Sequence, residues 1–396
     1  MSRIVVTGMG VISAIGNDLA QNHLSLREGK CGISDQLELF PTRYAGLLPF
    51  GSIHTGNETL QTSLNAFEPG VTRTSLLALQ AFNEAVAASG LSPAELTSAD
   101  TALIGASTVG GMCLTDELYH DANTKEPGSP YLASYDNASV TLYLQKRYGI
   151  GGIINTINTA CSSSANSIMY GAGLIQQGLA KRAIAGGADS LAKFTINGFN
   201  SLHILSAAVC RPFDAGRSGL NLGEGAAFLV LEKEEDAIGK KIYAVLSGYA
   251  NTNDAYHPSS LSDEGEGPYR SMNGALAMAG ISPSQISYIN AHGTGTENND
   301  LVESTAMLRL FGKVPPFAST KSYTGHTLGA AGAIEAVYSI LNIQHQEIYA
   351  GLQFTTPIPE TQLVPVAERT DGPVQHVMSN SFGFGGNCSS LIFSKA

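Results

Sequence analysis

Residues 157–178, INTACSSSANSIMYGAGLIQQG, combine a short apolar strand, a sharp turn and a helix built largely from small residues. Residues 317–321, FASTK, end another strand and are likewise followed by a Gly- and Ala-rich helix. Around these segments, apolar β-branched runs such as RIVVTGMG and TALIGAST alternate with Ala-rich helical stretches. Such alternation is typical of buried strands between layers of helices, so the sequence predicts an α/β fold.

The same order of elements occurs twice along the chain. Residues 79–111 and 276–296 both give a helix, a Gly, a Ser-Pro turn, a short helix, a strand and a Gly-rich loop. The order is kept while the spacing shifts, which favours an old duplication with loop insertions over the alternative, chance similarity. The charged segment 232–241, EKEEDAIGKK, separates the copies. We therefore predict an N-terminal half over residues 1–236 and a C-terminal half over residues 237–396.

The composition favours a large buried core. Charged residues make up only 14% of the chain, against about 25% in an average globular protein. Hydrophobic residues make up 43%, and there are 44 glycines. Disorder requires the opposite balance and is excluded. The net charge of −11 argues against a nucleic-acid-binding protein, which would need a basic surface.

The cysteines and the apolar runs indicate the cellular compartment. The five cysteines lie far apart, are odd in number and form no C-x-x-C pair, which argues against a disulfide framework or a zinc site. No apolar run approaches the roughly 18 residues needed to cross a bilayer, and the N-terminus lacks a signal-peptide pattern. We expect a cytoplasmic enzyme without a membrane span.

Cys161 is the candidate nucleophile. It stands at the predicted start of a helix, where free N–H groups and the helix dipole favour a thiolate. Ser162, Ser163 and Ser164 are small enough to let a substrate reach the sulfur. A buried structural cysteine is the alternative, because cysteine is among the most frequently buried residues.

Two histidines on Gly-rich loops are the candidate partners of this thiol. His292 lies in NAHGTGT, where Thr294 and Thr296 could bind a polar linear ligand. His326 follows Lys321 by five residues, in STKSYTGHTLG. Structural histidines and a surface lysine are the alternatives. A buried lysine would need a carboxylate partner, for which the candidates are Glu335, Asp300 and Glu303.

The segment SFGFGG at 381–386 predicts a loop with Phe382 and Phe384 as a lid over a site; a plain β-hairpin is the alternative. A cysteine with two histidines and no evident general-base carboxylate suits thioester chemistry. A cysteine protease is the rival interpretation, although it does not need two histidines on matching loops of a duplicated fold.

The chain resembles a β-ketoacyl-[acyl-carrier-protein] synthase of the elongating (I/II) class, within the thiolase-like superfamily. The resemblance covers nearly the whole chain and rests on TACSSS at 159–164, CRPFDAGRSGLNLGEGA at 210–226, NDAYHPSS at 253–260, NAHGTGT at 290–296, STKSYTGHTLGAAGAIE at 319–335 and SFGFGG at 381–386. The order Cys, His, His differs from the Cys-His-Asn set of the initiating class. Thiolases use a second cysteine as base, whereas Cys388 here stands where the synthase family usually has Asn.

This resemblance implies a duplicated five-layer α-β-α-β-α fold and a decarboxylative condensation. Cys161 would accept the acyl group, with its own N–H and that of Phe384 forming the oxyanion hole and Phe384 acting as gate. His292 and His326 would bind the malonyl thioester carbonyl. Lys321 would orient them through Glu303 and Glu335, with Asp300 kept after the His292 loop. The further residues implied to contact substrate are Thr294, Thr296, Ser259, Ser260, Val109 and Phe382.

The resemblance also implies substrates and partners. The acyl groups would arrive on the phosphopantetheine of an acyl carrier protein, with no other cofactor and no metal, in fatty-acid or polyene/polyketide synthesis. A homodimer, or a heterodimer with a homologous synthase or chain-length factor, is expected. A catalytically silent chain-length partner and a thiolase are the alternative functions. The net charge of −11 requires a local basic patch to bind an acidic carrier, for which the candidates are Arg73, Lys146, Arg147, Lys181 and Arg182.

Three departures from the family pattern stand out. The usual P-x-G-D after the His292 loop is ENND at 297–300, Asn387-Cys388 replaces the common Thr-Asn, and the stretch before residue 75 is shortened. Val109, at the expected floor of the acyl pocket, is small and would admit a longer chain or a larger residue from a partner subunit.

Overall fold

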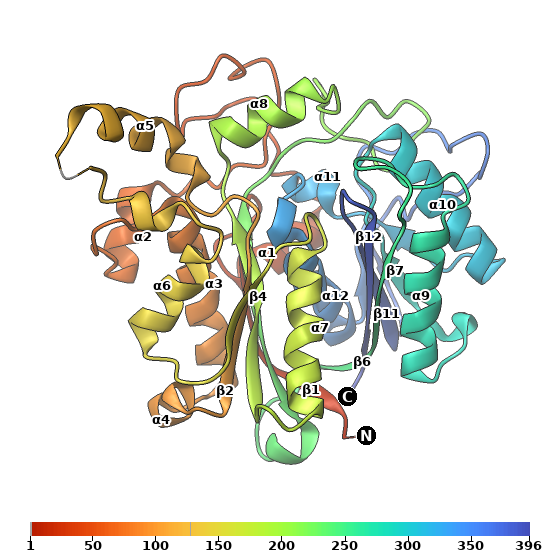
Figure 1. Ribbon diagram of the computed structural model, residues 1–396. Coiled ribbons are helices and arrows are strands. Elements are labelled where there is room, and N and C mark those ends of the chain that lie inside the picture. The colour runs from red at the N-terminus through yellow and green to blue at the C-terminus, as the bar shows by residue number, and fades with distance from the viewer. Residues whose placement is uncertain (1, 127) are drawn as a thin grey trace.

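Two sets of five strands form the framework of the fold (Figure 1). The structure is a computed structural model that describes residues 2–126 and 128–396. Along the sheet the strands follow the order β3-β2-β4-β5-β1 and then β6-β12-β11-β7-β8. The N-terminal set comprises β1 (Ile4–Ser13), β2 (Thr101–Ala106), β3 (Ile154–Ile157), β4 (Arg182–Asp189) and β5 (Gly225–Lys233). The C-terminal set comprises β6 (Ala244–Asn253), β7 (Tyr288–Asn290), β8 (Phe317–Ala318), β11 (His376–Phe382) and β12 (Asn387–Ser394).

The two sets have the same pairing pattern. In the N-terminal set, β2 is parallel to β3 and β4, and β5 is antiparallel to β4 and β1. In the C-terminal set, β7 is parallel to β8 and β11, and β12 is antiparallel to β11 and β6. This repeated order confirms the predicted duplicated α/β fold. The exact boundary between residues 236 and 237 stays a prediction.

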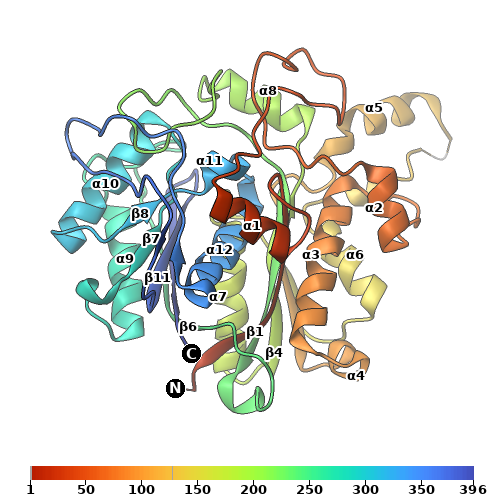
Figure 2. The ribbon, with the colours of Figure 1, turned by 180° about the vertical axis from the view of Figure 1, so that it is seen from behind.

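Helices complete five layers (Figures 1 and 2). β1 and β6 pair at Ile4, Val5 and Val6, and the two sets then diverge around α7 (Ser163–Gln176) and α12 (Ala331–His345). These two helices contact each other and pack on β4 and β11 respectively. The outer layers are α3 (Arg73–Ser89), and α9 (Glu266–Ala279) with α10 (Glu297–Phe311) beside it.

Shorter elements connect these layers. They are α1 (Leu19–Glu28), α2 (Asn57–Leu64), α4 (Pro93–Thr97), α5 (Thr115–Thr124), α6 (Ser139–Tyr148), α8 (Lys193–Ser201), α11 (Lys321–Thr324), β9 (Glu347–Ile348) and β10 (Thr370–Asp371). Among the helices in the described part of the chain, none combines the length and the apolar content that a bilayer crossing requires.

The central helices explain why the chain needs small residues. Every residue of α12 from Ala331 to Ile343 is buried. A side chain at Gly332 would place its Cβ 2.7 Å from the backbone nitrogen of Ala165, so α12 and α7 cross in backbone contact at this glycine. This close crossing brings the start of α12 against the start of α7, where Cys161 lies.

Arg73 is not a docking residue, and that prediction is wrong. It is 7% exposed, and its guanidinium binds both carboxylate oxygens of Glu224, at 2.6 and 2.9 Å, and the carbonyl oxygen of Ile53. Glu224 also accepts the backbone N–H groups of Ile53 and Leu191. The ion pair therefore fixes the start of α3 to β5 and to two loops.

Three of the other basic candidates form ion pairs, as Lys181 does with Asp100. Arg182 pairs with Glu95 and Glu232, and Arg147 pairs with Glu68. Arg182 begins β4, whereas Cys161 follows the end of β3, and both strands run parallel to β2. The Lys181–Arg182 pair therefore lies at the opposite end of the sheet from the thiol.

Breaking the Arg73–Glu224 pair should destabilise the protein strongly. Arg73→Met leaves an unpaired buried carboxylate, which costs about 3–5 kcal/mol of unfolding free energy. Urea unfolding followed by circular dichroism measures this loss. Lys181→Met, which breaks an exposed pair with Asp100, is the control and should barely move the midpoint. Equal midpoints for the two variants would show that the buried pair contributes nothing.

Candidate active site

Cys161 lies on a strained turn between β3 and α7. Ala160, the residue before it, has φ of 53°, a left-handed conformation that is uncommon for a residue with a side chain. Ser163 stabilises the turn, because its hydroxyl donates to the carbonyl of Ala160 and accepts the N–H of Thr159. The turn places the thiol, 7% exposed, at the N-terminus of a helix, as the sequence predicted.

The thiol is less acidic than its position in the sequence suggested. Burial raises the pKa of Cys161 to about 11, and this effect exceeds the opposing influence of Lys321 and of the N–H groups of Phe384 and Cys161. The expected thiolate is therefore not the resting form, because desolvation outweighs the helix N-terminus. The same two N–H groups converge on the sulfur, so a base must remove the proton when a substrate arrives.

His292 follows β7 on a loop that Glu303 holds from behind. The Glu303 carboxylate accepts the N–H groups of His292 and Gly293, each at 2.9 Å, and the amide of Asn380 at 3.1 Å. Burial raises the pKa of Glu303 to about 7. Glu303 contacts the loop backbone and Asn380. It therefore supports the loop directly, whereas the resemblance implied that Lys321 orients the histidines through Glu303.

Lys321 orients the ring of His292. Its ammonium donates to the His292 carbonyl at 2.7 Å, lies 3.2 Å from His292 Nδ1, and forms an ion pair with Glu335. A lysine ammonium has no acceptor, so Nδ1 must accept and the ring proton resides on Nε2. Glu335 of α12 is thus the carboxylate partner that the sequence required for a buried lysine.

Both imidazoles are neutral. Burial lowers the pKa of His292 and of His326 well below 6.5, and the charge of Lys321 lowers both further. The two rings are nearly perpendicular, with centroids 5.4 Å apart. Neither ring nitrogen of His326 has a hydrogen-bond partner within the described residues, so His326 has its full hydrogen-bonding capacity available for a substrate.

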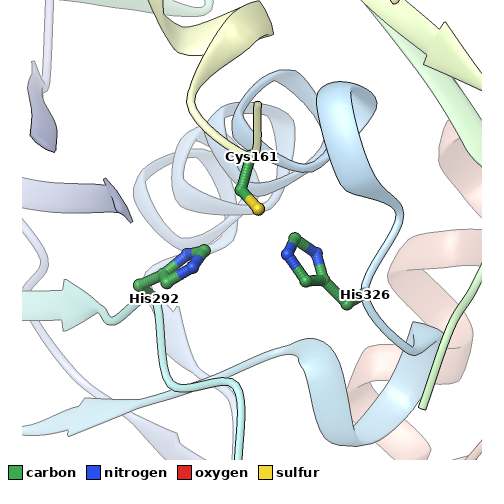
Figure 3. A group of neighbouring side chains, drawn as sticks. All are labelled: Cys161, His292 and His326. Atoms are coloured by element: carbon green, nitrogen blue, oxygen red, sulfur yellow. The ribbon is translucent and has the colours of Figure 1, made fainter. Parts of the chain in front are cut away.

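The thiol and the two rings face one another from three distant segments (Figure 3). One ligand-type atom from each of Cys161, His292 and His326 lies within 4.8 Å of the other two. Such a set could hold a metal ion by distance alone. The proton on His292 Nε2 and the nearby charge of Lys321 oppose a cation there, so the donor set fits a hydrogen-bonded substrate better.

A cavity of about 430 Å³ opens over this cluster. Thr294 and Thr296 line it, with their hydroxyls 2.9 Å apart. Phe382 lies beside the ring of His292, at 5.8 Å between centroids, and Phe384 stacks on Phe199 of α8 at 6.0 Å. The predicted residues lining the cavity are Cys161, Ser259, Ser260, His292, Thr294, Thr296, His326, Phe382 and Phe384.

Val109 and Asp300 lie outside this cavity. Val109 is fully buried in a cluster with Leu191 and Leu328 and does not line this cavity. Asp300 is also fully buried, and it accepts the N–H groups of Phe213 and Gly295. Asp300 therefore shapes the Thr294–Thr296 loop without reaching the cavity.

Sequence reasoning missed two supporting residues. Asp189 accepts the N–H groups of Thr108, Val109 and Gly329, and so ties the loop after β2 to the segment after His326. The sequence could have pointed to Asp189, because this acidic residue ends an otherwise apolar strand. Nothing in the sequence around Phe199 indicates that its ring stacks on Phe384.

Comparisons with known proteins agree with this site. A family model described as the beta-ketoacyl synthase N-terminal domain matches residues 1–237, and the model of the C-terminal domain matches residues 243–355. The chain is 35% identical, over 415 residues, to 3-oxoacyl-[acyl-carrier-protein] synthase 2 of Staphylococcus aureus (strain COL), covering 99% of this chain and 98% of that protein. The chain therefore belongs to the β-ketoacyl synthase family.

Solved structures give the same result. The ishigamide ketosynthase/chain length factor superposes with a TM-score of 0.91 at 30% identity, covering 100% of this chain and 99% of that one. A second structure, AntDE:AntF, shows a type II PKS acyl-carrier protein in complex with its ketosynthase. It superposes with a TM-score of 0.88 at 27% identity and full coverage of both chains. These similarities confirm the expected thiolase-like fold.

The protonation state of the rings can be measured directly. In ¹⁵N NMR spectra, His292 and His326 should remain neutral as the pH falls through 6.5, because burial and Lys321 lower both pKa values. Lys321→Met combined with Glu335→Gln removes the cation without leaving an unpaired carboxylate. It should raise the pKa of His292. A ring of the unmodified protein that becomes charged near pH 6.5 would refute the neutral pair.

Proposed function

We propose that this β-ketoacyl synthase condenses an acyl group held on Cys161 with malonyl-acyl carrier protein, releasing carbon dioxide and 3-oxoacyl-acyl carrier protein. The observation that carries this proposal is the pair of neutral imidazoles facing a buried thiol, one of them without a hydrogen-bond partner among the described residues. Two neutral rings supply hydrogen-bond donors for a carbonyl oxygen that becomes an enolate.

Acylation comes first. The Cys161 sulfur attacks the carbonyl carbon of the acyl-carrier thioester while His326, neutral and unpartnered, accepts the thiol proton. The N–H groups of Cys161 and Phe384 stabilise the oxyanion. The bond from the carbonyl carbon to the carrier sulfur then breaks, and that sulfur takes up the proton, so no net proton is gained or lost.

Condensation is the second step and takes place in the same cavity. His292 donates from Nε2, because the hydrogen bond from Lys321 to Nδ1 keeps the ring proton on Nε2. His326 donates beside it to the same malonyl thioester oxygen. The carboxylate leaves as carbon dioxide and its electron pair forms the enolate. The enolate carbon attacks the acyl carbonyl, and the Cys161 sulfur leaves and regains a proton, so each turnover consumes one proton.

The cavity supports a long, thin substrate arm. Thr294 and Thr296 offer hydroxyls along its wall, with Ser259 and Ser260 near the exposed side and Phe384 as the gate. The acyl carrier protein would reach the thiol through this opening, without another cofactor or a metal. The S. aureus relative is named as an acyl-carrier synthase, and AntDE:AntF pairs a ketosynthase with its carrier.

We extend the proposal to the assembly and the compartment. The chain would work in the cytoplasm, in fatty-acid or polyketide synthesis. It would work as a dimer of two copies or with a homologous chain, since the ishigamide structure pairs a ketosynthase with a chain length factor. A thiolase would need a second cysteine in the cavity. Cys388 is fully buried, bonds to the Gly386 carbonyl and does not line it.

Removal of Cys161 should abolish acylation. After incubation with acyl-carrier protein, the intact mass of the unmodified chain should rise by one acyl group, and that of Cys161→Ala should stay unchanged. His292→Ala should retain self-acylation better than condensation, because His292 acts in the second step. His326→Ala should slow both steps, because His326 is the base for acylation and a hydrogen-bond donor in condensation.

Cys388→Ala is the matched control, since it removes a buried thiol that lies outside the cavity, and it should acylate normally. An unmodified chain that takes up no acyl group would support the silent chain-length partner instead. Rapid malonyl condensation by Cys161→Ala would exclude the proposed nucleophile.

A further inference from the structure

A cluster of three asparagine side chains lies directly behind the loop 383–386. The side-chain oxygen of Asn387 accepts three short hydrogen bonds, from Ser162 Oγ at 2.7 Å, Asn166 Nδ2 at 2.9 Å and Asn251 Nδ2 at 2.7 Å, and a longer one from Ser389 Oγ at 3.5 Å. We call Asn387, Asn166, Asn251 and Ser162 the amide cluster. One carbonyl oxygen thus joins the start of α7, its first turn, β6 and β12.

The amide cluster sits between the loop and the nucleophile. Asn387 immediately follows the loop, and its own carbonyl accepts the N–H of Gly383 at 2.8 Å. Ser162 immediately follows Cys161 and is fully buried. Hydrogen bonds to Asn387 therefore fix the end of the loop relative to the residue beside the thiol.

The tip of the loop is held only lightly. Gly385 is exposed, has φ of 83° and would meet nothing within 4 Å if it carried a Cβ. Its N–H donates to the carbonyl of Pro258 at 2.7 Å, and its carbonyl accepts from Asn253 at 2.9 Å. The loop is anchored at its end instead, where the N–H of buried Asp254 donates to the Gly386 carbonyl at 2.7 Å and Asn387 joins the amide cluster.

We propose that Asn387 is a positioning residue that keeps the loop 383–386 closed over Cys161. This inference rests on the proposed function, because closure matters only if the thiol carries an acyl group. In the closed loop, the N–H of Phe384 points at the Cys161 sulfur and the Phe384 ring stacks on Phe199. Release of the three hydrogen bonds frees the loop to withdraw that N–H and to admit water.

Water that enters the acylated site would hydrolyse the thioester on Cys161. A water oxygen adds to the carbonyl of the acyl-Cys161 thioester, and the bond between carbon and sulfur breaks. The products are a carboxylic acid and the free thiol, which takes up a proton from the water. Asn387 therefore protects the acyl-enzyme as well as shaping its oxyanion hole.

The test is the rate at which iodoacetamide alkylates Cys161, followed by mass spectrometry of the peptide that contains it. Asn387→Ala should accelerate alkylation by about a hundredfold, since it removes three short hydrogen bonds and each net hydrogen bond is worth about fivefold in the closing equilibrium. The acyl adduct on Cys161 should also be lost faster in water. Asn387→Asp keeps an acceptor oxygen of the same shape and should restore both rates to within about twofold of the unmodified chain.

Ser394→Ala is the matched control. Ser394 is buried on the same strand, and its hydroxyl lies 2.7 Å from Ser247 Oγ and from His376 Nδ1, away from the amide cluster. A loss of strand stability alone would make Ser394→Ala and Asn387→Ala equally fast. Equal rates, or an Asn387→Ala rate equal to that of the unmodified chain, would overturn the inference.

Asn251→Ala tests the same idea from the surface. Asn251 is exposed, so its truncation removes one donor without emptying a buried site, and it should give an intermediate acceleration. Alkylation needs no acyl carrier protein. A chain that condenses normally but shows no acceleration refutes only the role of Asn387, whereas acceleration without condensing activity refutes only the proposed function.

Discussion

The buried ammonium group of Lys321 needs hydrogen-bond acceptors around it, and the rest of the site supplies them. Lys321 is 1% exposed, and its charge is stable there only because Glu335, the carbonyl of His292 and the ring of His292 all accept from it. Glu335 comes from the central helix α12, so the layer that separates the two sheets also orients the imidazole. Burial, reinforced by the same charge, keeps both histidines neutral. A neutral imidazole can donate a hydrogen bond from one ring nitrogen while the other accepts one.

Buried carboxylates fix the loops around this centre. Asp300 and Glu303 each accept backbone N–H groups of the loop 292–296, which lines the cavity. Asp189 and Glu224 accept backbone N–H groups of loops farther from the cavity. Each carboxylate bonds to groups that would otherwise be buried without a partner. Flexible Gly-rich segments, which give a thin substrate arm access to the backbone, are thereby held in one conformation.

Local sequence patterns predicted the order of strands and helices and the position of the nucleophile. The other features of the site depend on contacts between residues that lie far apart in the sequence. The strand–turn–helix around Cys161 and the duplicated order of elements depend on neighbouring residues, and the structure confirms both. Arg73 and Glu224 lie 151 positions apart, so no local pattern could pair them. The raised pKa of Cys161 likewise follows from tertiary packing.

The central claim is that one cavity performs both acyl transfer and decarboxylative carbon–carbon bond formation. Its most direct test incubates the purified protein with acyl-carrier protein and malonyl-carrier protein and follows product mass together with released carbon dioxide. The account predicts a 3-oxoacyl-carrier longer by two carbons and one carbon dioxide for each product. A stable acyl-enzyme that never yields an elongated carrier-bound product would contradict it.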